Sequence, residues 1–131
     1  MGEHNITVDF NCAVTQQQLE EAEKLSNEAV FANIPVEAIY PSDNELCNYD
    51  YRSKKEIKGQ VRLTKIGDVD LCACCGTHVK SAGELGLIKL LSVHPFREGV
   101  RIEMLCGFRA FRFLSQVYEQ NKLVSQAFSV P

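Results

Sequence analysis

Half of the chain's cysteines and one of its three histidines lie within the stretch Asp70-Leu71-Cys72-Ala73-Cys74-Cys75-Gly76-Thr77-His78-Val79. Thiolate sulfur and imidazole nitrogen are the atoms that zinc most often binds in proteins. An extended chain, rising about 3.3 Å per residue, would separate Cys74 from His78 by roughly 13 Å, which is too far for two ligands of one ion. We therefore expect the chain to fold back between them, with Gly76 allowing a left-handed or tight backbone conformation. The spacing predicts half of a metal site.

Structural thiols explain the same residues equally well. Free cysteine is among the most buried residue types, and a strand over residues 71–75 would place Cys72 and Cys74 on one face. A disulfide framework is disfavoured, because we expect no secretory signal and the chain is large and apolar enough to fold without crosslinks. On spacing alone, metal ligands and structural thiols both remain open.

The composition indicates an ordinary globular domain. The 131 residues are 45% hydrophobic and 24% charged, close to the averages for globular proteins, and this length favours one domain. No apolar run approaches the ~18 residues that span a bilayer, and the first residues lack the basic-then-apolar pattern of a signal peptide. We expect a cytoplasmic location and no membrane partner.

Basic side chains are concentrated in residues 52–65, although the net charge of the chain is −3. This segment contains one acidic residue, Glu56, and six basic ones: Arg52, Lys54, Lys55, Lys58, Arg62 and Lys65. Such a patch can follow phosphates while the remainder of the protein stays acidic. The alternative is a solvated loop and strand edge whose lysines prevent edge-to-edge pairing. The acidic net charge argues against DNA as a partner.

Hydrophobic periodicity predicts three helices and six strands. Capping boxes at Thr15 with Gln18 and at Ser42 with Glu45 begin helices over residues 15–33 and 44–49, and a long helix follows Gly107. The first helix has an apolar stripe made by Leu19, Ala22, Leu25, Ala29 and Val30. Strands are expected at residues 6–10, 36–40, 61–66, 69–75, 87–93 and 100–106, with a polar connection over residues 94–99. This order favours an α+β fold, with a mostly antiparallel sheet flanked by helices.

The last helix has one apolar face, which carries Ala110, Leu114, Val117, Val124 and Phe128. It has little core left to cover. We therefore expect residues 1–107 to form the α+β domain. Residues 108–131 are expected to form a helix that leads toward a domain outside this chain.

Several motifs in order resemble the editing domain of alanyl-tRNA synthetase. The run Cys74-Cys75-Gly76-Thr77-His78-Val79, followed by Gly83-Glu84-Leu85-Gly86, resembles its C-G-G-T-H-V and T-G-E-I-G segments. Freestanding alanyl-tRNA editing proteins carry the same segments, and the editing domain of threonyl-tRNA synthetase carries them more loosely. Further similarities are the N-x-P-V turn at residues 33–36, the V-R-x-x-x-I-G strand at 61–67 and the R-x-E…G-x-R-A junction at 101–110. The resemblance covers residues 6–111 and implies the α+β fold of the threonyl and alanyl-tRNA synthetase editing domains.

The resemblance also implies a zinc site. In the family, a Cys-x-x-x-His pair and an earlier His-x-x-x-His pair hold the metal, and the first pair corresponds to Cys74 and His78. The second pair has no counterpart here, so we expect a fragment that lacks the upstream helix and holds zinc weakly or not at all. Cys75 stands where the family has glycine, and Cys72 and Cys75 are candidate substitute ligands.

The implied reaction is the hydrolysis of a wrong amino acid, such as serine or glycine, from alanine tRNA. Zinc would either orient the amino group or activate water, and the Thr77 hydroxyl would lie in the pocket or shape the turn. The implied tRNA contacts are Arg52, Lys54, Lys55, Lys58 and Arg62. A homodimer is a further expected partner. Two alternatives stay open: a non-catalytic tRNA-binding or dimerisation module without metal, and a redox or zinc-storage protein that uses Cys72, Cys74 and Cys75.

Overall fold

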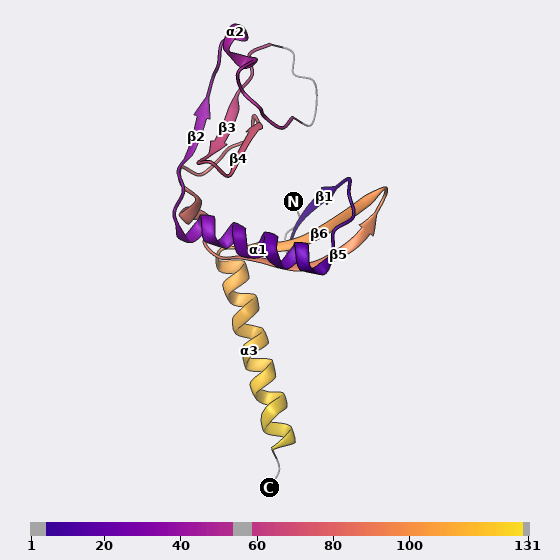
Figure 1. Cartoon of the computed structure of the whole chain (residues 1–131). Coiled ribbons are helices and arrows are strands. Elements are labelled where there is room, and N and C mark those ends of the chain that lie inside the picture. The colour runs from indigo at the N-terminus through magenta and orange to yellow at the C-terminus, as the bar shows by residue number, and fades with distance from the viewer. Residues whose placement is uncertain (1–4, 54–58, 130–131) are drawn as a thin grey trace. The chain divides into compact units, whose positions relative to one another are not determined.

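The computed structural model describes residues 5–53 and 59–129. Its elements follow in the order β1 (Ile6–Phe10), α1 (Gln16–Phe31), β2 (Val36–Ile39), α2 (Asp43–Leu46), β3 (Leu63–Ile66), β4 (Asp70–Ala73), the 3-10 helix η1 (Ala82–Leu85), β5 (Ile88–Phe96), β6 (Gly99–Cys106) and α3 (Phe108–Phe128) (Figure 1). Within the described residues the strands form two antiparallel three-stranded sheets, ordered β1-β6-β5 and β2-β3-β4. The predicted α+β class is confirmed.

The chain divides into two compact units, and each unit contains one of these sheets. The first unit comprises the described residues of Met1–Asn27 and Leu85–Pro131, and the second comprises those of Glu28–Glu84. The sheet β1-β6-β5 therefore belongs to the first unit. The second unit contains the sheet β2-β3-β4 and the loop in which the sequence predicts a metal site.

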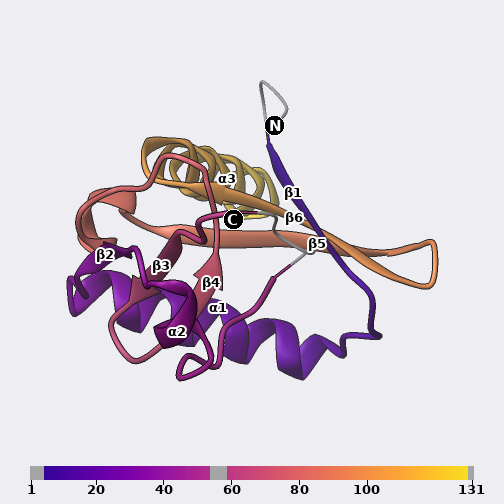
Figure 2. The ribbon, with the colours of Figure 1, turned by 90° about the horizontal axis from the view of Figure 1, so that it is seen from above.

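The sheet of the first unit is built around the long hairpin of β5 and β6, with β1 alongside β6 (Figure 2). The predicted polar connection over residues 94–99 is wrong, because His94, Pro95 and Phe96 continue β5 in register with Arg101, Val100 and Gly99. Only Arg97 and Glu98 remain as the turn, and Arg97 adopts a φ of 53°. Cross-strand pairing thus overrides the local turn signal of His94-Pro95.

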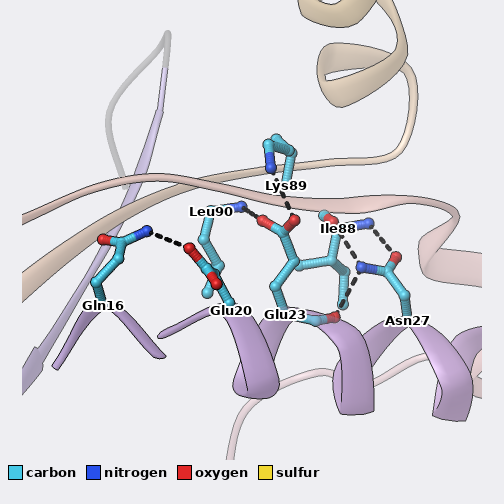
Figure 3. A network of polar contacts seen from close by, with 7 residues as sticks. All are labelled: Gln16, Glu20, Glu23, Asn27, Ile88, Lys89 and Leu90. Atoms are coloured by element: carbon cyan, nitrogen blue, oxygen red, sulfur yellow. Dashed lines mark hydrogen bonds and ion pairs between the residues drawn. The ribbon is translucent and has the colours of Figure 1, made fainter. Parts of the chain in front are cut away.

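Helix α1 contacts the edge of β5 through polar side chains (Figure 3). The Asn27 amide donates to the Ile88 carbonyl at 2.8 Å and accepts from the Ile88 N–H at 2.9 Å. Glu23 accepts from the Leu90 N–H at 2.6 Å and pairs with the Lys89 ammonium at 2.7 Å. These two side chains satisfy backbone groups that the edge strand would otherwise leave without partners.

The predicted apolar stripe of α1 is therefore only partly correct. Leu19 and Val30 are each 6% exposed, whereas Leu25 is 54% exposed. The reason is that α1 meets the edge of a sheet, where unpaired N–H and C=O groups favour polar partners over apolar ones. The predicted N-terminal capping box is present, since the Thr15 N–H donates to Gln18 Oε1 at 2.9 Å and the Gln18 N–H donates to Thr15 Oγ1 at 3.2 Å.

The sheet of the second unit contains the most deeply buried side chains of that unit. Leu63 and Thr64 on β3 are 0% and 1% exposed, and the neighbouring Val61 is 5% exposed. Strand β3 lies between β2 and β4, in register with both. The short helix α2 covers Asp43–Leu46, which is earlier than the predicted 44–49 because its Ser42 capping box begins the helix at once.

Helix α3 follows β6 in the first unit and leaves most of its length exposed (Figure 1). Ala110, near its start, is fully buried. Seven large apolar side chains of α3 are exposed, namely Phe108, Phe111, Leu114, Tyr118, Leu123, Val124 and Phe128. Among residues 5–53 and 59–129, no helix is long and apolar enough to cross a membrane.

Candidate metal-binding loop

Strand β4 ends at Ala73, and the chain then folds back on itself through Cys74 and His78. The Sγ atom of Cys74 and the Nε2 atom of His78 lie 3.5 and 3.9 Å from the position that a Cβ on Gly76 would occupy. Both potential ligand atoms therefore lie beside the same residue, Gly76. The predicted fold-back is present. Of the two conformations expected at Gly76, left-handed or tight, the left-handed one is absent, because the φ angle of Gly76 lies outside that region. Ordinary backbone conformations are sufficient for this turn.

Arg62, just before β3, contacts the first half of this loop. Its Nη1 atom donates hydrogen bonds to the carbonyl oxygens of Cys74 and Gly76, at 2.9 and 2.7 Å. The Cys74 N–H in turn donates to the Arg62 carbonyl at 3.2 Å. The Gly76 N–H lies 3.4 Å from Cys74 Sγ and donates to it. One arginine directly before β3 thus contacts both Cys74 and Gly76.

The second half of the loop is held by the segment between α1 and β2. The Val36 N–H donates to the Lys80 carbonyl at 2.9 Å, and the Ala82 N–H donates to the Ile34 carbonyl at 2.8 Å. Asn33, with a φ of 50°, accepts from the Gly83 N–H at 3.0 Å. Two segments that are distant in the sequence, residues 33–36 and 80–83, therefore close the loop from its far end.

Comparison with known proteins assigns the family. Residues 61–103 match the model of the threonyl and alanyl tRNA synthetase second additional domain. The chain is 33% identical over 113 residues to the alanyl-tRNA editing protein AlaX-L of Pyrococcus horikoshii. The aligned region covers 84% of this chain and 28% of AlaX-L. It is 34% identical over 128 residues to an alanine–tRNA ligase of Salinispora tropica, covering 94% of this chain and 14% of the ligase.

This chain belongs to the alanyl-tRNA editing domain family. An alanine–tRNA ligase of Halorubrum lacusprofundi is also similar, at 35% identity over 99 residues. The chain spans less than a third of AlaX-L and a small part of each ligase. The family model covers both β3 and β4 and the whole Cys74–His78 loop.

Two other cysteines, Cys72 and Cys75, lie near the Cys74–His78 loop in the sequence. Cys72 lies on β4 opposite Thr64, and burial, together with the nearby Asp70 carboxylate, raises the pKa of its thiol. Cys75 is exposed. In the part of the chain that the structure describes, no three His, Cys, Asp or Glu side chains form a group that could hold a metal ion. The loop therefore presents two zinc-type donors and not a complete site.

The predicted tRNA-contacting residues are only partly described. Arg52 pairs with Asp70 through Nε at 3.1 Å and Nη2 at 2.5 Å, and its backbone bonds to Leu71 and Ala73 of β4. Arg62 donates into the loop, as given above. Lys54, Lys55 and Lys58 lie outside the described residues. Both described arginines of this set therefore contact β4 or the loop that follows it, a role that the clustering of charge did not indicate.

The remaining residues of the loop differ in exposure and role. Thr77 and His78 are exposed, which leaves the imidazole and the hydroxyl accessible to a ligand. Glu84 Oε1 accepts from the N–H groups of Lys80 and Ser81, at 2.9 and 3.0 Å. Its carboxylate therefore caps η1 and helps to hold the end of the loop. Sequence reasoning placed Asn33 in the N-x-P-V turn but missed its contact with Gly83. The available signal was its place just after the first helix, where asparagine can adopt the left-handed conformation that ends a helix.

Proposed function

We propose that this chain is part of a hydrolase that edits mischarged aminoacyl-tRNA, and that it supplies two ligands of a zinc site. The proposed substrates are Ser-tRNA(Ala) and Gly-tRNA(Ala), and the proposed location is the cytoplasm. In this reaction water adds to the ester carbonyl, and the ribose oxygen of the tRNA leaves with a proton. The observation that carries the proposal is the convergence of Cys74 Sγ and His78 Nε2 beside Gly76 in a chain of this family.

The donor atoms fit zinc in kind but not in number. Cysteine sulfur and histidine nitrogen are usual zinc ligands, and catalytic sites take three protein ligands with an open fourth position. The described residues supply two. We therefore propose that a complete site needs further donors. Cys72 and Cys75 are the candidates among the described residues, and any other donor comes from outside them. A bound zinc would supply a positive charge that orients the substrate amino group or activates water.

The groups of this chain that would meet the substrate are exposed on the loop. The Thr77 hydroxyl is next to His78 and is proposed to contact the aminoacyl ester. The tRNA backbone is proposed to bind the basic set defined above, Arg52, Lys54, Lys55, Lys58 and Arg62. Because the guanidinium of Arg52 already pairs with Asp70 and that of Arg62 with the loop, the three lysines carry most of this proposed contact.

The experiment that tests this proposal combines metal analysis with deacylation of mischarged tRNA. An editing hydrolase requires both a bound metal and turnover of Ser-tRNA(Ala). A binding module without metal would instead show affinity for tRNA and no turnover. A redox or zinc-storage protein would show reversible thiol oxidation that tRNA does not affect.

We also propose that α3 pairs with a second copy of the chain. Its positions Leu114, Val117, Asn121, Val124 and Phe128 follow the alternating spacing of three and four residues that coiled coils use. The charged residues of α3 lie outside this stripe and comprise Arg109, Arg112, Glu119 and Lys122. A single asparagine within such a stripe favours a defined register between two helices. The exposure of Leu114, Val124 and Phe128 leaves the stripe open to a partner helix.

A further inference from the structure

The Cys74 turn is organised by contacts to a single residue outside it. Arg62 accepts a backbone hydrogen bond from the Cys74 N–H at 3.2 Å, and its side chain donates to the Cys74 carbonyl at 2.9 Å. Both polar groups of the Cys74 backbone are therefore bound to the same arginine. In a third contact, Arg62 Nη1 donates to the Gly76 carbonyl at 2.7 Å, so the arginine also binds the backbone two residues after Cys74.

Two carbonyl oxygens that converge on one nitrogen restrict the backbone between them. The Nη1 atom of arginine has two N–H groups, so it can satisfy both acceptors. The carbonyls of Cys74 and Gly76 must then both point at the same end of the guanidinium. In this turn the Gly76 N–H lies 3.4 Å from Cys74 Sγ and donates to it. The sulfur is thereby held beside Gly76, which His78 Nε2 also approaches.

The backbone is hydrogen-bonded on both sides of His78. Beyond His78, the Lys80 carbonyl accepts from the Val36 N–H, and Lys80 and Ser81 donate to Glu84. His78 therefore lies two residues after the Gly76 carbonyl, which Arg62 binds, and two residues before the Lys80 carbonyl, which Val36 binds.

We propose that Arg62 is a positioning residue whose guanidinium holds the Cys74–Gly76 turn, so that Cys74 Sγ and His78 Nε2 face one point before any metal ion binds. The proposal rests on the proposed function only for the identity of that point as a metal site. Arginine suits this role because its guanidinium stays charged and presents its donors in a fixed plane. A residue used mainly for tRNA phosphates would instead leave the loop unchanged when it is replaced.

Backbone relaxation of the full chain by NMR, without metal or tRNA, tests the role of Arg62. In the wild-type chain the amides of residues 75–78 should have order parameters of about 0.85, as in rigid backbone, and in Arg62→Gln they should fall below about 0.6. Arg62→Lys keeps a charged donor without the planar fork and should give intermediate values. The matched control is Lys65→Gln, which removes one positive charge from the opposite face of β3 and should leave the loop rigid.

Two outcomes would overturn the proposal. The first is a loop in Arg62→Gln that is as rigid as in the wild-type chain. The second is loss of the dispersed β3 and β4 resonances in both Arg62 variants, which would assign Arg62 to the stability of the sheet and not to the loop. Because no metal, tRNA or turnover enters this measurement, the two proposals can fail separately. If the loop effect is seen but the chain joined to an upstream His-x-x-x-His helix never deacylates tRNA with zinc present, the proposed function is refuted and the role of Arg62 is intact.

Discussion

The Sγ atom of Cys74 and the Nε2 atom of His78 both lie within 4 Å of the position that a Cβ on Gly76 would occupy. Three residues lie between Cys74 and His78 in sequence, and the loop brings both side chains beside Gly76. A site whose ligands are already arranged loses less conformational entropy when it binds. This relationship leads to the predictions on metal binding and catalysis.

The chain alone should hold zinc weakly or not at all. A complete structural zinc site contributes about 10–16 kcal/mol, and here Cys74 and His78 are the ligands that the loop presents. We expect less than one zinc per chain after dialysis, as measured by elemental analysis. Stoichiometric zinc that persists in a Cys72→Ser, Cys75→Ser double variant would contradict this expectation, whereas zinc that is lost in that variant would identify the substitute ligands.

The contact between α1 and β5 should contribute measurably to stability. Asn27→Ala removes both bonds to Ile88 and leaves a half-buried N–H and C=O without these partners, so the free energy of unfolding should fall by about 1–3 kcal/mol. Urea unfolding measures this change. The control is Ser26→Ala, an exposed neighbour on the same helix. Equal stability of the two variants would show that the side chain of Asn27 is not needed at the edge of the sheet.

The sequence predicted most elements because their signals are local. Alternation marked the strands of both sheets, and the Thr15 and Ser42 capping boxes marked two helix starts that the structure confirms. The helix over 15–33 and the strand over 36–40 were each correct to within two residues at either end. These features depend only on neighbours along the chain, which is the information that periodicity contains.

The features that the sequence did not predict depend on distant partners. The face that α1 presents to β5 carries Glu23 and Asn27, and a count of apolar residues cannot find polar contacts to a strand edge. The same limit applies to Arg62, which was grouped with the basic segment because its charge is visible and its carbonyl partners are not. For the candidate site, the pair Cys74 and His78 was predictable, and the residues that hold it were not.

Helix α3 should make the chain dimeric through one face only. Val124→Glu places a charge in the stripe and should shift the chain to monomer in sedimentation velocity. Leu123→Glu introduces the same charge one position earlier, about 100° around the helix axis and outside the stripe, and should leave the dimer unchanged. Both residues are more than half exposed, so neither change disturbs a core. A monomeric wild-type chain, or equal behaviour of the two variants, would refute this interface.

The basic segment should bind tRNA through electrostatic contacts. Lys54→Ala with Lys55→Ala should weaken tRNA binding. The slope of log affinity against log salt concentration should become less negative by about 1–2. The control is Arg112→Ala with Lys122→Ala, which removes two charges from α3. Binding measured by filter retention at several salt concentrations compares the two pairs. Equal losses for both pairs would mean that net charge, and not this segment, determines the affinity.

The most direct test of the central claim is the deacylation rate of Ser-tRNA(Ala) with zinc present. The proteins compared are this chain joined at its amino terminus to a helix that carries a His-x-x-x-His pair, and the same protein with His78→Ala. Misplacement of reacting groups by about 1 Å can cost roughly 100-fold in rate, so removing a zinc ligand should reduce deacylation by at least that factor while tRNA binding persists. Undiminished turnover by the His78→Ala protein would contradict a metal site at this loop.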